Sequence, residues 1–425
     1  MAQAKGDGTA NYDIKRGCWF VRVTYVDPKT GETKRKKLKG AEEKSPTPKG
    51  KSISLKIGQK WLENLENGLL PDADTITLWE WLERWLNDYA KPKVRTKTFD
   101  KYESYMRLYI KPALGNVPLK RLTTPDIQRV LNRLLIDGGK ERQPLSSGTV
   151  RSTRRYLIQA LNQAVVDGLI LKNVAKGTTP PKLVKKEIRP LTPEEAEKLV
   201  IAAKEAVGNL VVGKTVRQNE KINKEMTARI VRDAAYIAIL LALATGMRLG
   251  EVFGLKWDCV DLEKGIVYVK RSLITNRKGM QFQEPKTPKS RRQIPLPADV
   301  AAELRKYKKR QNWHKHLLGD LWEEHDLVIT GQFGRVLDTS HFTNRYFKPL
   351  LKTAGIPETV TYHDLRHTHA TMLLLKGIPV KVVSERLGHS TIAMTLDTYS
   401  HVLPAMQDAA VKALEGVFTG KSSNL

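Results

Sequence analysis

The segment TYHDLRHTHA, residues 361–370, places three histidines and one arginine within seven positions. If the segment is helical, His363 and His367 lie four residues apart on one face, which is the spacing of a zinc-binding pair. Arg366 lies between them, however, and its permanent positive charge would repel a divalent cation. The histidines could also be packed in a helix without any chemical role. A third possibility is a phosphate site, in which the guanidinium binds two oxygens while the imidazole of His363 transfers a proton.

The chain as a whole is strongly basic. Its 425 residues include 73 Lys and Arg against 45 Asp and Glu, which gives a net charge of +28 and a pI of about 9.9. A chain this basic commonly binds a polyanion such as a nucleic acid, because each neutralised phosphate releases a condensed counterion. A ribosome-associated protein or a merely soluble basic protein would have the same charge balance.

The composition also indicates the compartment. Cys18 and Cys259 are the two cysteines and lie far apart, which argues against a zinc finger or a disulfide framework and fits a reducing cytoplasm. The longest apolar run, residues 234–244, has 11 residues, whereas a membrane-spanning helix needs roughly 20. The N-terminus has no apolar signal region. We therefore expect a soluble protein in the cytoplasm.

The length predicts two or three domains, and the local patterns favour three. Residues 1–62 are predicted to be β-rich, because apolar and polar residues alternate in CWFVRVTYV and a turn follows at DPKTG. This region contains 12 Lys and three Arg against six acidic residues, a local charge of +9, so a nucleic-acid-binding module is plausible. A charged edge hairpin that resists aggregation is the alternative. Residues 42–52 are expected to form a loop or linker.

Residues 74–178 show a helical pattern. TLWEWLERWLNDYAK places large apolar side chains on one face, which we interpret as core rather than as a platform for base stacking. Thr96 to Thr98 and Ser146 to Thr149 are expected N-caps, and the Lys and Arg residues beside them would favour phosphate binding at the helix starts. A linker is expected at 178–190.

Residues 188–425 are predicted to form a mixed α+β domain, so the whole chain is expected to be multidomain and mainly α with small β-sheets. Thr192 caps a helix with Pro193 at its first position and Glu195 completing a capping box. A buried helix, strands around GIVYVKRSL and RRQIPLP, and further helices follow. The polar segment 207–230 predicts no particular element.

Further side chains could join the phosphate site. ATGMRLGE places Arg248 after a glycine-containing turn and Glu251 three residues later, where the carboxylate could hold the arginine or a backbone N–H group. An ordinary exposed ion pair would have the same spacing. Lys286 in PKT lies in an expected turn between two strands, LGHS supplies His389, and Tyr399 follows ten residues later.

Together with His363 and Arg366, this ordered set resembles the active-site residues of the tyrosine recombinase (phage integrase) family. The motifs that carry the resemblance are ATGMRLGE, PKT, HDLRHTHAT, LGHS and DTYSHV, and they span roughly residues 188–405. Residues 74–178 more loosely resemble the helical domain of this family that binds core sites. The first sixty residues resemble the strand-based module that binds arm sites in integrases of temperate phages and conjugative transposons.

The resemblance implies a mechanism without metal, cofactor or ATP. Tyr399 would attack a scissile phosphodiester and form a 3′-phosphotyrosyl bond. The implied roles of the other residues are phosphate binding by Arg248 and Arg366, protonation of the leaving 5′-oxygen by Lys286, acid or base catalysis by His363, a phosphate hydrogen bond from His389, and organisation of the set by Glu251. His367 and His369 match no family role, so we expect them to pack or to hydrogen-bond other residues behind the site.

The resemblance also implies the partners. These are double-stranded DNA attachment sites (core sites and arm sites) and three further copies of the chain in a tetramer on DNA, with a host DNA-bending protein and an excision factor as further candidates. The protein would associate with the nucleoid of a bacterial host and integrate or excise a mobile element. The apolar stripe after Tyr399 in PAMQDAAVKALEGVF would dock on a neighbouring copy or on its own domain.

Two other functions remain open at this point. A type IB topoisomerase-like relaxase would share the tyrosine chemistry, but separate arm-binding and core-binding modules argue against it. A DNA-binding regulator with an inactive catalytic fold would not need the complete set of six candidate residues.

Overall fold

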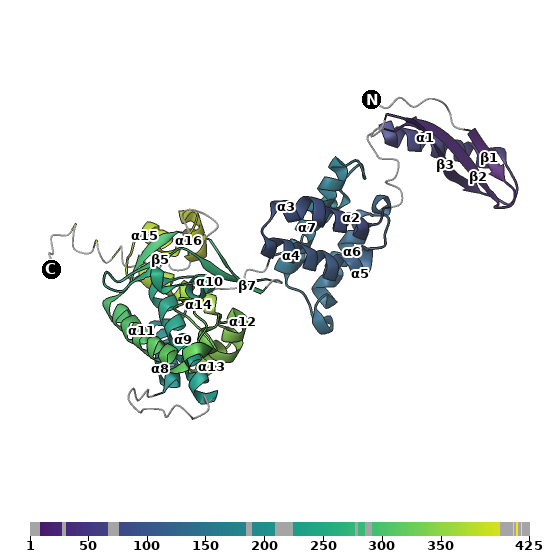
Figure 1. Cartoon of the computed structure of the whole chain (residues 1–425). Coiled ribbons are helices and arrows are strands. Elements are labelled where there is room, and N and C mark those ends of the chain that lie inside the picture. The colour runs from purple at the N-terminus through teal and green to yellow at the C-terminus, as the bar shows by residue number, and fades with distance from the viewer. Residues whose placement is uncertain are drawn as a thin grey trace. The chain divides into compact units, whose positions relative to one another are not determined.

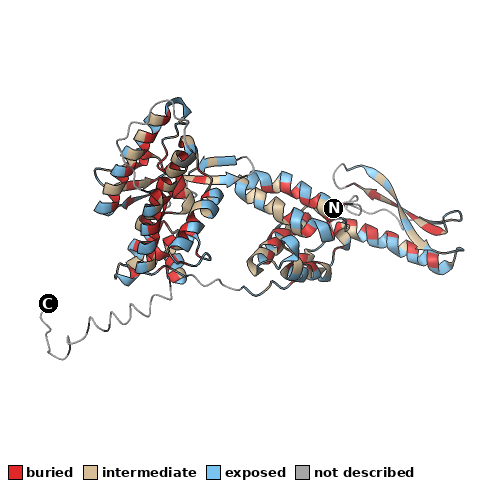
Figure 2. Cartoon of the chain, turned by 90° about the horizontal axis from the view of Figure 1, so that it is seen from below, coloured by how far each residue is buried: buried red, intermediate tan, exposed pale blue. Residues whose placement is uncertain are grey.

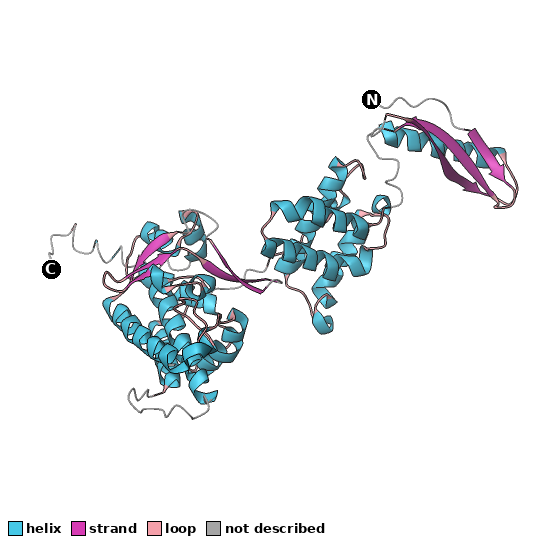
Figure 3. Ribbon diagram, viewed as in Figure 1, coloured by secondary structure: helices cyan, strands magenta, loops and turns pink. Residues whose placement is uncertain are grey.

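The structure is a computed structural model that describes residues 9–27, 31–66, 76–183, 189–208, 224–276, 279–284 and 291–399, with Val411, Leu414 and Phe418. The chain divides into two units, residues 1–185 and 186–425 (Figure 1). Helices dominate, and the strands form small antiparallel sheets (Figure 3). The predicted fold class, mainly α with small β-sheets, is therefore confirmed. In the described part of the chain, no helix combines the length and the apolar character needed to cross a membrane.

The first unit begins with a small sheet covered by one helix. The elements are β1 (Thr9–Asp13), β2 (Cys18–Val26), β3 (Thr33–Glu42) and α1 (Pro48–Glu66). The three strands are antiparallel in the order β1-β2-β3. Alternation along β2 points Val21 and Val23 to one face, where they are fully buried and pack with Trp61 and Leu65 of α1.

Helix α1 differs from the sequence-based prediction of a loop or linker at 42–52. Thr47 caps it, because its hydroxyl accepts a hydrogen bond from the N–H of Gly50 at 3.0 Å. Pro48 suits the first turn of a helix. Two glycines lower the helix propensity, but Gly58 allows a close approach to the sheet: a Cβ atom there would lie 2.8 Å from Cγ1 of Val21. Packing thus overrides propensity, and the predicted domain boundary at residue 62 falls inside α1.

Residues 76–183 form a helical bundle, as the periodicity predicts. Its main helices are α2 (Leu78–Arg84), α4 (Thr96–Tyr105), α6 (Thr124–Asp137) and α7 (Ser147–Val166), with the shorter segments η1 (Trp85–Ala90), α3 (Lys91–Lys93), η2 (Met106–Ile110), α5 (Lys111–Leu114), η3 (Leu119–Arg121), η4 (Lys140–Arg142) and η5 (Val174–Gly177). The apolar stripe that begins at Leu78 is buried in the core of this bundle, with Trp81 fully buried. The interpretation of the stripe as core is confirmed.

Side-chain caps fix several helix starts in the bundle. Ser146 caps α7 by accepting a hydrogen bond from the N–H of Thr149, as predicted. The predicted cap at Thr96 to Thr98 is wrong, because α4 begins after Arg95 without a side-chain cap. Thr123 and Asp126 form a capping box that starts α6.

In its described residues, the second unit is a layer of helices with two small sheets beside them. Its elements are α8 (Pro193–Val207), α9 (Lys224–Thr245), α10 (Leu249–Phe253), η6 (Trp257–Cys259), β4 (Val260–Asp261), β5 (Ile266–Val269), β6 (Ser272–Asn276), β7 (Gly279–Gln283), β8 (Arg292–Pro295), α11 (Ala298–Leu318), η8 (Gly319–Leu321), η9 (Gln332–Gly334), α12 (Thr339–Phe342), η10 (Thr343–Phe347), α13 (Lys348–Thr353), α14 (Tyr362–Leu375), α15 (Val380–Leu387) and α16 (Ile392–Tyr399). Strands β4, β5 and β8 pair in that order, and β6 pairs with β7.

Helix α9 forms the centre of the second unit. Residues 234–239 are all buried, and Figure 2 shows the buried positions along the facing sides of the helices. The predicted capping box at Thr192 and Glu195 starts α8, which packs against α9. Of the segment 207–230, for which the sequence predicts no element, residues 209–223 lie outside the described part.

Candidate active site

The turn between α9 and α10 places Arg248 at the start of α10. Gly246 in this turn has a φ of +66°, and a Cβ atom there would lie 2.7 Å from both His369 and Leu387. A glycine is therefore required for the conformation and for the close approach. Thr245 supports the turn, because its hydroxyl accepts a hydrogen bond from the N–H of Met247.

Glu251 holds Arg248 in the two ways that the sequence suggests. One carboxylate oxygen accepts from the backbone N–H of Arg248 at 2.9 Å, and the other accepts from Nη1 of the guanidinium at 2.9 Å. Arg292 of β8 binds the same carboxylate through Nη2 at 2.9 Å, and both side chains of this second pair are only 6% exposed. Burial alone would raise the pKa of Glu251, but Arg292, together with Arg248, lowers the pKa below its usual value.

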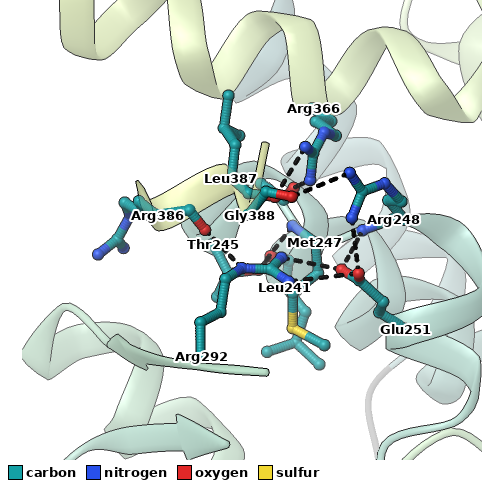
Figure 4. A network of polar contacts seen from close by, with 11 residues as sticks. Leu241, Thr245, Met247, Arg248, Glu251, Arg292, Arg366, Arg386, Leu387 and Gly388 are labelled. Carbon is teal, nitrogen blue, oxygen red and sulfur yellow. Dashed lines mark hydrogen bonds and ion pairs between the residues drawn. The ribbon is translucent and has the colours of Figure 1, made fainter. Parts of the chain in front are cut away.

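Arg366 of α14 lies in the same cluster and is 2% exposed. Its Nη1 donates to the carbonyl of Gly246 at 2.7 Å, and its Nη2 donates to the carbonyl of Leu387 at 2.8 Å. A guanidinium has five N–H groups, so these bonds leave donors for a phosphate. Arg248 donates to the adjacent carbonyl of Gly388 at 3.4 Å, so both arginines contact the end of α15 (Figure 4).

Two more arginines complete what we call the arginine cluster, which comprises Arg248, Glu251, Arg292, Arg366 and Arg386. Nε of Arg292 donates to the carbonyl of Arg386 at 2.7 Å, and Nη2 of Arg386 donates to the carbonyls of Ala244 and Pro295, each at 3.0 Å. Hydrogen bonds of the cluster therefore connect α9, β8, α10, α14 and α15.

The arginine cluster carries a surplus of positive charge. Burial, and then the nearby Arg248, lower the pKa of Arg366 to about 9, which still leaves this guanidinium charged at neutral pH. Burial, and then Arg292, also lower the pKa of Arg386. One carboxylate, that of Glu251, is held between the arginines. An anion bound against Arg248 and Arg366 would relieve their mutual repulsion, which is the electrostatic condition for a phosphate site.

Helix α14 begins at a cap in which the carboxylate of Asp364 accepts a hydrogen bond from the N–H of Thr361 at 2.7 Å. The three histidines of this helix have different environments. His363 in the first turn is exposed, and partial desolvation followed by the charge of Arg366 lowers its pKa. His367 lies one turn later, and its Nδ1 is 2.9 Å from the hydroxyl of Tyr399.

His369 belongs to the support behind the site, as expected. Its Nε2 accepts from Nε of Arg386 at 3.1 Å, so its Nδ1 carries the proton and donates to the carbonyl of Leu243 at 2.7 Å. Burial lowers the pKa of His369 to about 4, so the ring is neutral at neutral pH.

His389 follows Gly388, the left-handed residue that ends α15. Its Nδ1 is 2.8 Å from the hydroxyl of Thr395, and its backbone N–H donates to the carbonyl of Ser384. Burial, and then the charges of Arg366 and Arg248, lower the pKa of His389 to about 4. The neutral ring therefore lies within the influence of both arginines.

Tyr399 is the last residue of α16 and is 2% exposed. Its ring packs with Ala370, Leu374, Val383 and Leu387. Burial raises the pKa of Tyr399 to about 12, against the opposing charge of Arg366. The phenol is therefore protonated at neutral pH.

The structure brings together most of the predicted residues. Arg248, Glu251, Arg366, His389 and Tyr399 lie around α14 and the end of α15. Lys286 lies outside the described residues, between the end of β7 and the start of β8.

Three residues were missed by the sequence analysis. Arg292 and Arg386 had no local signal beyond their basic character, and His367 was assigned to the scaffold although its spacing from His363 drew attention to it. Among the described residues, no group of three or more His, Cys, Asp or Glu side chains could hold a metal ion.

Clustered arginines close to a buried tyrosine are the arrangement expected of an enzyme that binds a phosphodiester and uses a tyrosine as nucleophile. Residues 215–406 match the phage integrase family, and residues 77–135 match the SAM-like N-terminal domain of phage integrases. A "Tyrosine recombinase XerC-like" protein of Caldanaerobacter subterraneus subsp. tengcongensis is 31% identical over 96% of this chain and 98% of its own length. The chain belongs to the phage integrase (tyrosine recombinase) family.

Other relatives and solved structures agree with this assignment. An integrase of Streptomyces ambofaciens is 27% identical over 98% of this chain and 97% of its own length. The structure of the transposon Tn1549 integrase in complex with transposon right end DNA has a TM-score of 0.59 at 23% identity and covers 80% of this chain and 99% of that one. A lambda integrase dimer bound to a COC′ core site gives 0.54 at 20% identity over 93% and 95% of the two chains. At these identities the structures show a shared fold.

Proposed function

We propose that this chain is a site-specific DNA recombinase that integrates and excises a mobile element, such as a prophage or a conjugative transposon. The observation that carries the proposal is the convergence of two arginines and a tyrosine. Arg248 and Arg366 donate to adjacent carbonyls at the end of α15, and the Tyr399 hydroxyl lies beside the helix that carries Arg366. Tyrosine recombinases cleave and rejoin DNA through a tyrosine intermediate, and this constellation suits that chemistry.

In the proposed mechanism, the oxygen of Tyr399 attacks the scissile phosphorus and a 3′-phosphotyrosyl bond replaces the bond to the 5′-oxygen. Arg248 and Arg366 bind the non-bridging oxygens and stabilise the charge of the transition state. Lys286 gives a proton to the leaving 5′-oxygen. Because the phosphotyrosyl bond conserves the energy of the phosphodiester, the 5′-hydroxyl of another strand can reverse the reaction without ATP.

The remaining candidate residues have supporting roles in this mechanism. Glu251 orients Arg248 through the two hydrogen bonds described above. His389 is a hydrogen-bond partner for the phosphate, since its neutral ring lies near both arginines. His363 is the family's candidate for proton transfer. We propose that no metal ion is required, because the arginines supply the positive charge at the phosphate.

A basic cavity beside the arginine cluster supports DNA binding by the second unit. It has a volume of about 690 Å³ and includes Arg292 in its wall. The other cationic residues that line it are Lys256, Lys270, Arg271 and Arg291. One carboxylate, that of Glu284, also lines the cavity and pairs with Arg291, so the lining keeps a surplus of positive charge. Such a surplus suits a phosphate backbone, which binds largely through counterion release. We assign this catalytic role to residues 188–425.

We propose that the N-terminal sheet binds arm sites. Strands β2 and β3 pair Arg22 with Lys37 and Thr24 with Arg35, on the face opposite the buried Val21. The three basic side chains of these pairs are exposed, as is Lys39 beside them. A sheet face with this charge can enter a DNA groove or follow its backbone.

We propose that the bundle within residues 74–178 binds core sites. Helix α7 starts at a side-chain-capped N-terminus and carries Arg151, Arg154 and Arg155 in its first half. A capped helix start beside several arginines favours phosphate contacts. With two DNA duplexes cut on two strands each, the working complex would be a tetramer of this chain. A host DNA-bending protein and an excision factor are further candidate partners.

One experiment tests the proposed function. The protein is incubated in EDTA with a nicked suicide DNA that carries its attachment site, and covalent adducts are separated on a denaturing gel. The wild-type chain should form an adduct at Tyr399, and Tyr399→Phe should form none. Strict dependence on a metal ion, without an adduct, would contradict the proposal.

Removal of the N-terminal module tests its assignment. Since Leu65 packs on the sheet, the deletion should span residues 1–66 rather than end at 62. We expect the truncated chain to lose binding to arm sites and recombination while it still forms the adduct on core DNA. Unchanged recombination would show that the module has another role.

A further inference from the structure

The hydroxyl of the nucleophile contacts a histidine to which the sequence gives no chemical role. Nδ1 of His367 lies 2.9 Å from the oxygen of Tyr399, and the two ring centroids are 5.6 Å apart. His363 packs edge-on against the ring of His367, with 4.8 Å between their centroids. His363 is also exposed, whereas Tyr399 is 2% exposed. The ring of His367 therefore contacts both His363 and the nucleophile.

We propose that Nδ1 of His367 accepts the phenolic proton of Tyr399 when the tyrosine attacks DNA, a step that rests on the proposed recombinase function. A general base must lie within hydrogen-bond reach of the proton that it removes, about 2.6 to 3.2 Å between heavy atoms, and His367 meets this condition before DNA is bound.

The chemistry of Tyr399 explains why such a base is needed. Burial raises the pKa of Tyr399 to about 12, so the phenol keeps its proton at neutral pH. A neutral phenol is a poor nucleophile, and loss of its proton during the attack requires an acceptor in direct contact. The neutral imidazole tautomer with its proton on Nε2 offers the lone pair of Nδ1 to the phenol.

The proposed cleavage step moves two protons. The bond from the Tyr399 oxygen to phosphorus forms as the bond from phosphorus to the 5′-oxygen breaks. The phenolic proton moves to Nδ1 of His367, and a proton from Lys286 moves to the 5′-oxygen. In the rejoining step, the oxygen of a 5′-hydroxyl attacks phosphorus and its proton returns to the neutral amine of Lys286. The phosphotyrosyl bond breaks, and the imidazolium of His367 returns its proton to the tyrosine oxygen.

His367→Asn separates proton acceptance from positioning. The side-chain oxygen of asparagine can take the place of Nδ1 and accept the hydrogen bond, but it cannot take up the proton. We expect single-turnover cleavage of the suicide DNA to fall about 10²- to 10⁴-fold, the usual range for loss of a general base. His316→Asn, at an exposed position of α11, is the matched control and should cleave as the wild type does.

A second substrate shows whether a variant is impaired in removing the proton of the tyrosine or in protonating the leaving 5′-oxygen. In DNA with a 5′-bridging phosphorothiolate, the leaving sulfur needs no proton. This substrate should restore cleavage to Lys286→Ala, which lacks the acid, but not to His367→Asn, which lacks the base. Added imidazole should partly restore His367→Ala, and this variant serves as the test if the asparagine variant fails to fold.

Three outcomes would overturn the proposal. The first is cleavage by His367→Asn within a few-fold of the wild type, which would leave His367 a positioning role only. The second is rescue of His367→Asn by the phosphorothiolate. The third is an unrescued loss in His363→Asn with normal cleavage in His367→Asn, which would return the role to His363. Absence of any adduct with the wild-type chain would instead contradict the recombinase function itself.

Discussion

The two halves of the active site are built in different ways. In the arginine cluster, each guanidinium donates to a carboxylate or to backbone carbonyls of separate elements, and Arg292 and Arg366 are almost fully buried. Helix α16, which carries Tyr399, has eight residues, of which only Thr395 and Tyr399 are buried. The half proposed to bind phosphate is thus held from several sides, whereas the proposed nucleophile belongs to a short helix with few buried residues.

This difference suits the two tasks. Electrostatic stabilisation of a transition state requires charges that are already in place and do not reorganise during the reaction. A nucleophile that becomes covalently attached to a DNA strand, and later releases it, benefits from a segment that opens at low free energy. Each of the following predictions changes one half and compares it with the other.

We expect the largest effect on the free energy of unfolding from Glu251→Gln in the arginine cluster. The substitution removes the negative charge between Arg248 and Arg292 and leaves the latter buried without its counterion. Loss of one partner of a buried ion pair typically lowers the free energy of unfolding by about 3–5 kcal/mol. Urea denaturation followed by circular dichroism measures this loss.

Glu263→Gln, at an exposed position, is the matched control and should change the free energy of unfolding by less than about 0.5 kcal/mol. The double variant Glu251→Met with Arg292→Met should recover much of the stability, because apolar side chains can replace a buried pair. It should not recover cleavage, since Arg248 still lacks its carboxylate. A single-variant loss below about 1 kcal/mol would show that the cluster is not anchored by this pair.

Local signals in the sequence account for much of the fold. Capping boxes and apolar periodicity predict the start of α8, the cap of α7 and the core stripe that begins at Leu78. Helix α1 was missed because Gly50 and Gly58 lower the local helix propensity, while its stabilisation comes from packing on a sheet formed by an earlier part of the chain.

The contacts of the site also divide into those that local spacing predicts and those that it does not. The contact of Arg248 with Glu251 lies within one helical turn, so the spacing predicts it. The contacts of Arg292 with Glu251 and of His367 with Tyr399 join residues 41 and 32 positions apart, and no periodicity reports on such pairs. The roles of the individual site residues remain predictions to be tested by the variants proposed above.

Lowering the pH should reduce the free energy of unfolding through His369, which supports the arginine cluster. We expect this reduction to be smaller than the loss caused by Glu251→Gln. Burial lowers the pKa of His369 to about 4, whereas an unfolded histidine titrates near about 6.5. Between these values the unfolded chain binds a proton that the folded chain does not. The contribution of the neutral histidine to the free energy of unfolding is therefore fully present above about pH 6.5. It falls as the pH drops towards 4, by up to about 1.4 kcal/mol per pH unit for each such histidine.

Chemical denaturation at a series of pH values measures this slope. His369→Gln should reduce the slope by about one proton, because glutamine keeps a donor and an acceptor but does not titrate. His314 is buried on α11 and its pKa is also lowered to about 4, mainly by burial, so His314→Gln should give the same reduction. If only His314→Gln changed the slope, protonation of His369 would not control the cluster.

The smallest effect is expected at α16, from Tyr399→Phe. The change removes the hydroxyl that contacts His367 but keeps the ring among Ala370, Leu374 and Leu387. Loss of one such hydrogen bond should lower the free energy of local opening by about 1 kcal/mol, which makes the amides of residues 392–399 exchange about five times faster. Hydrogen exchange with mass spectrometry compares these residues with α14, whose exchange should not change. Equal acceleration in both helices would show that the nucleophile is part of the anchored half, and the contrast between the two halves would then be wrong.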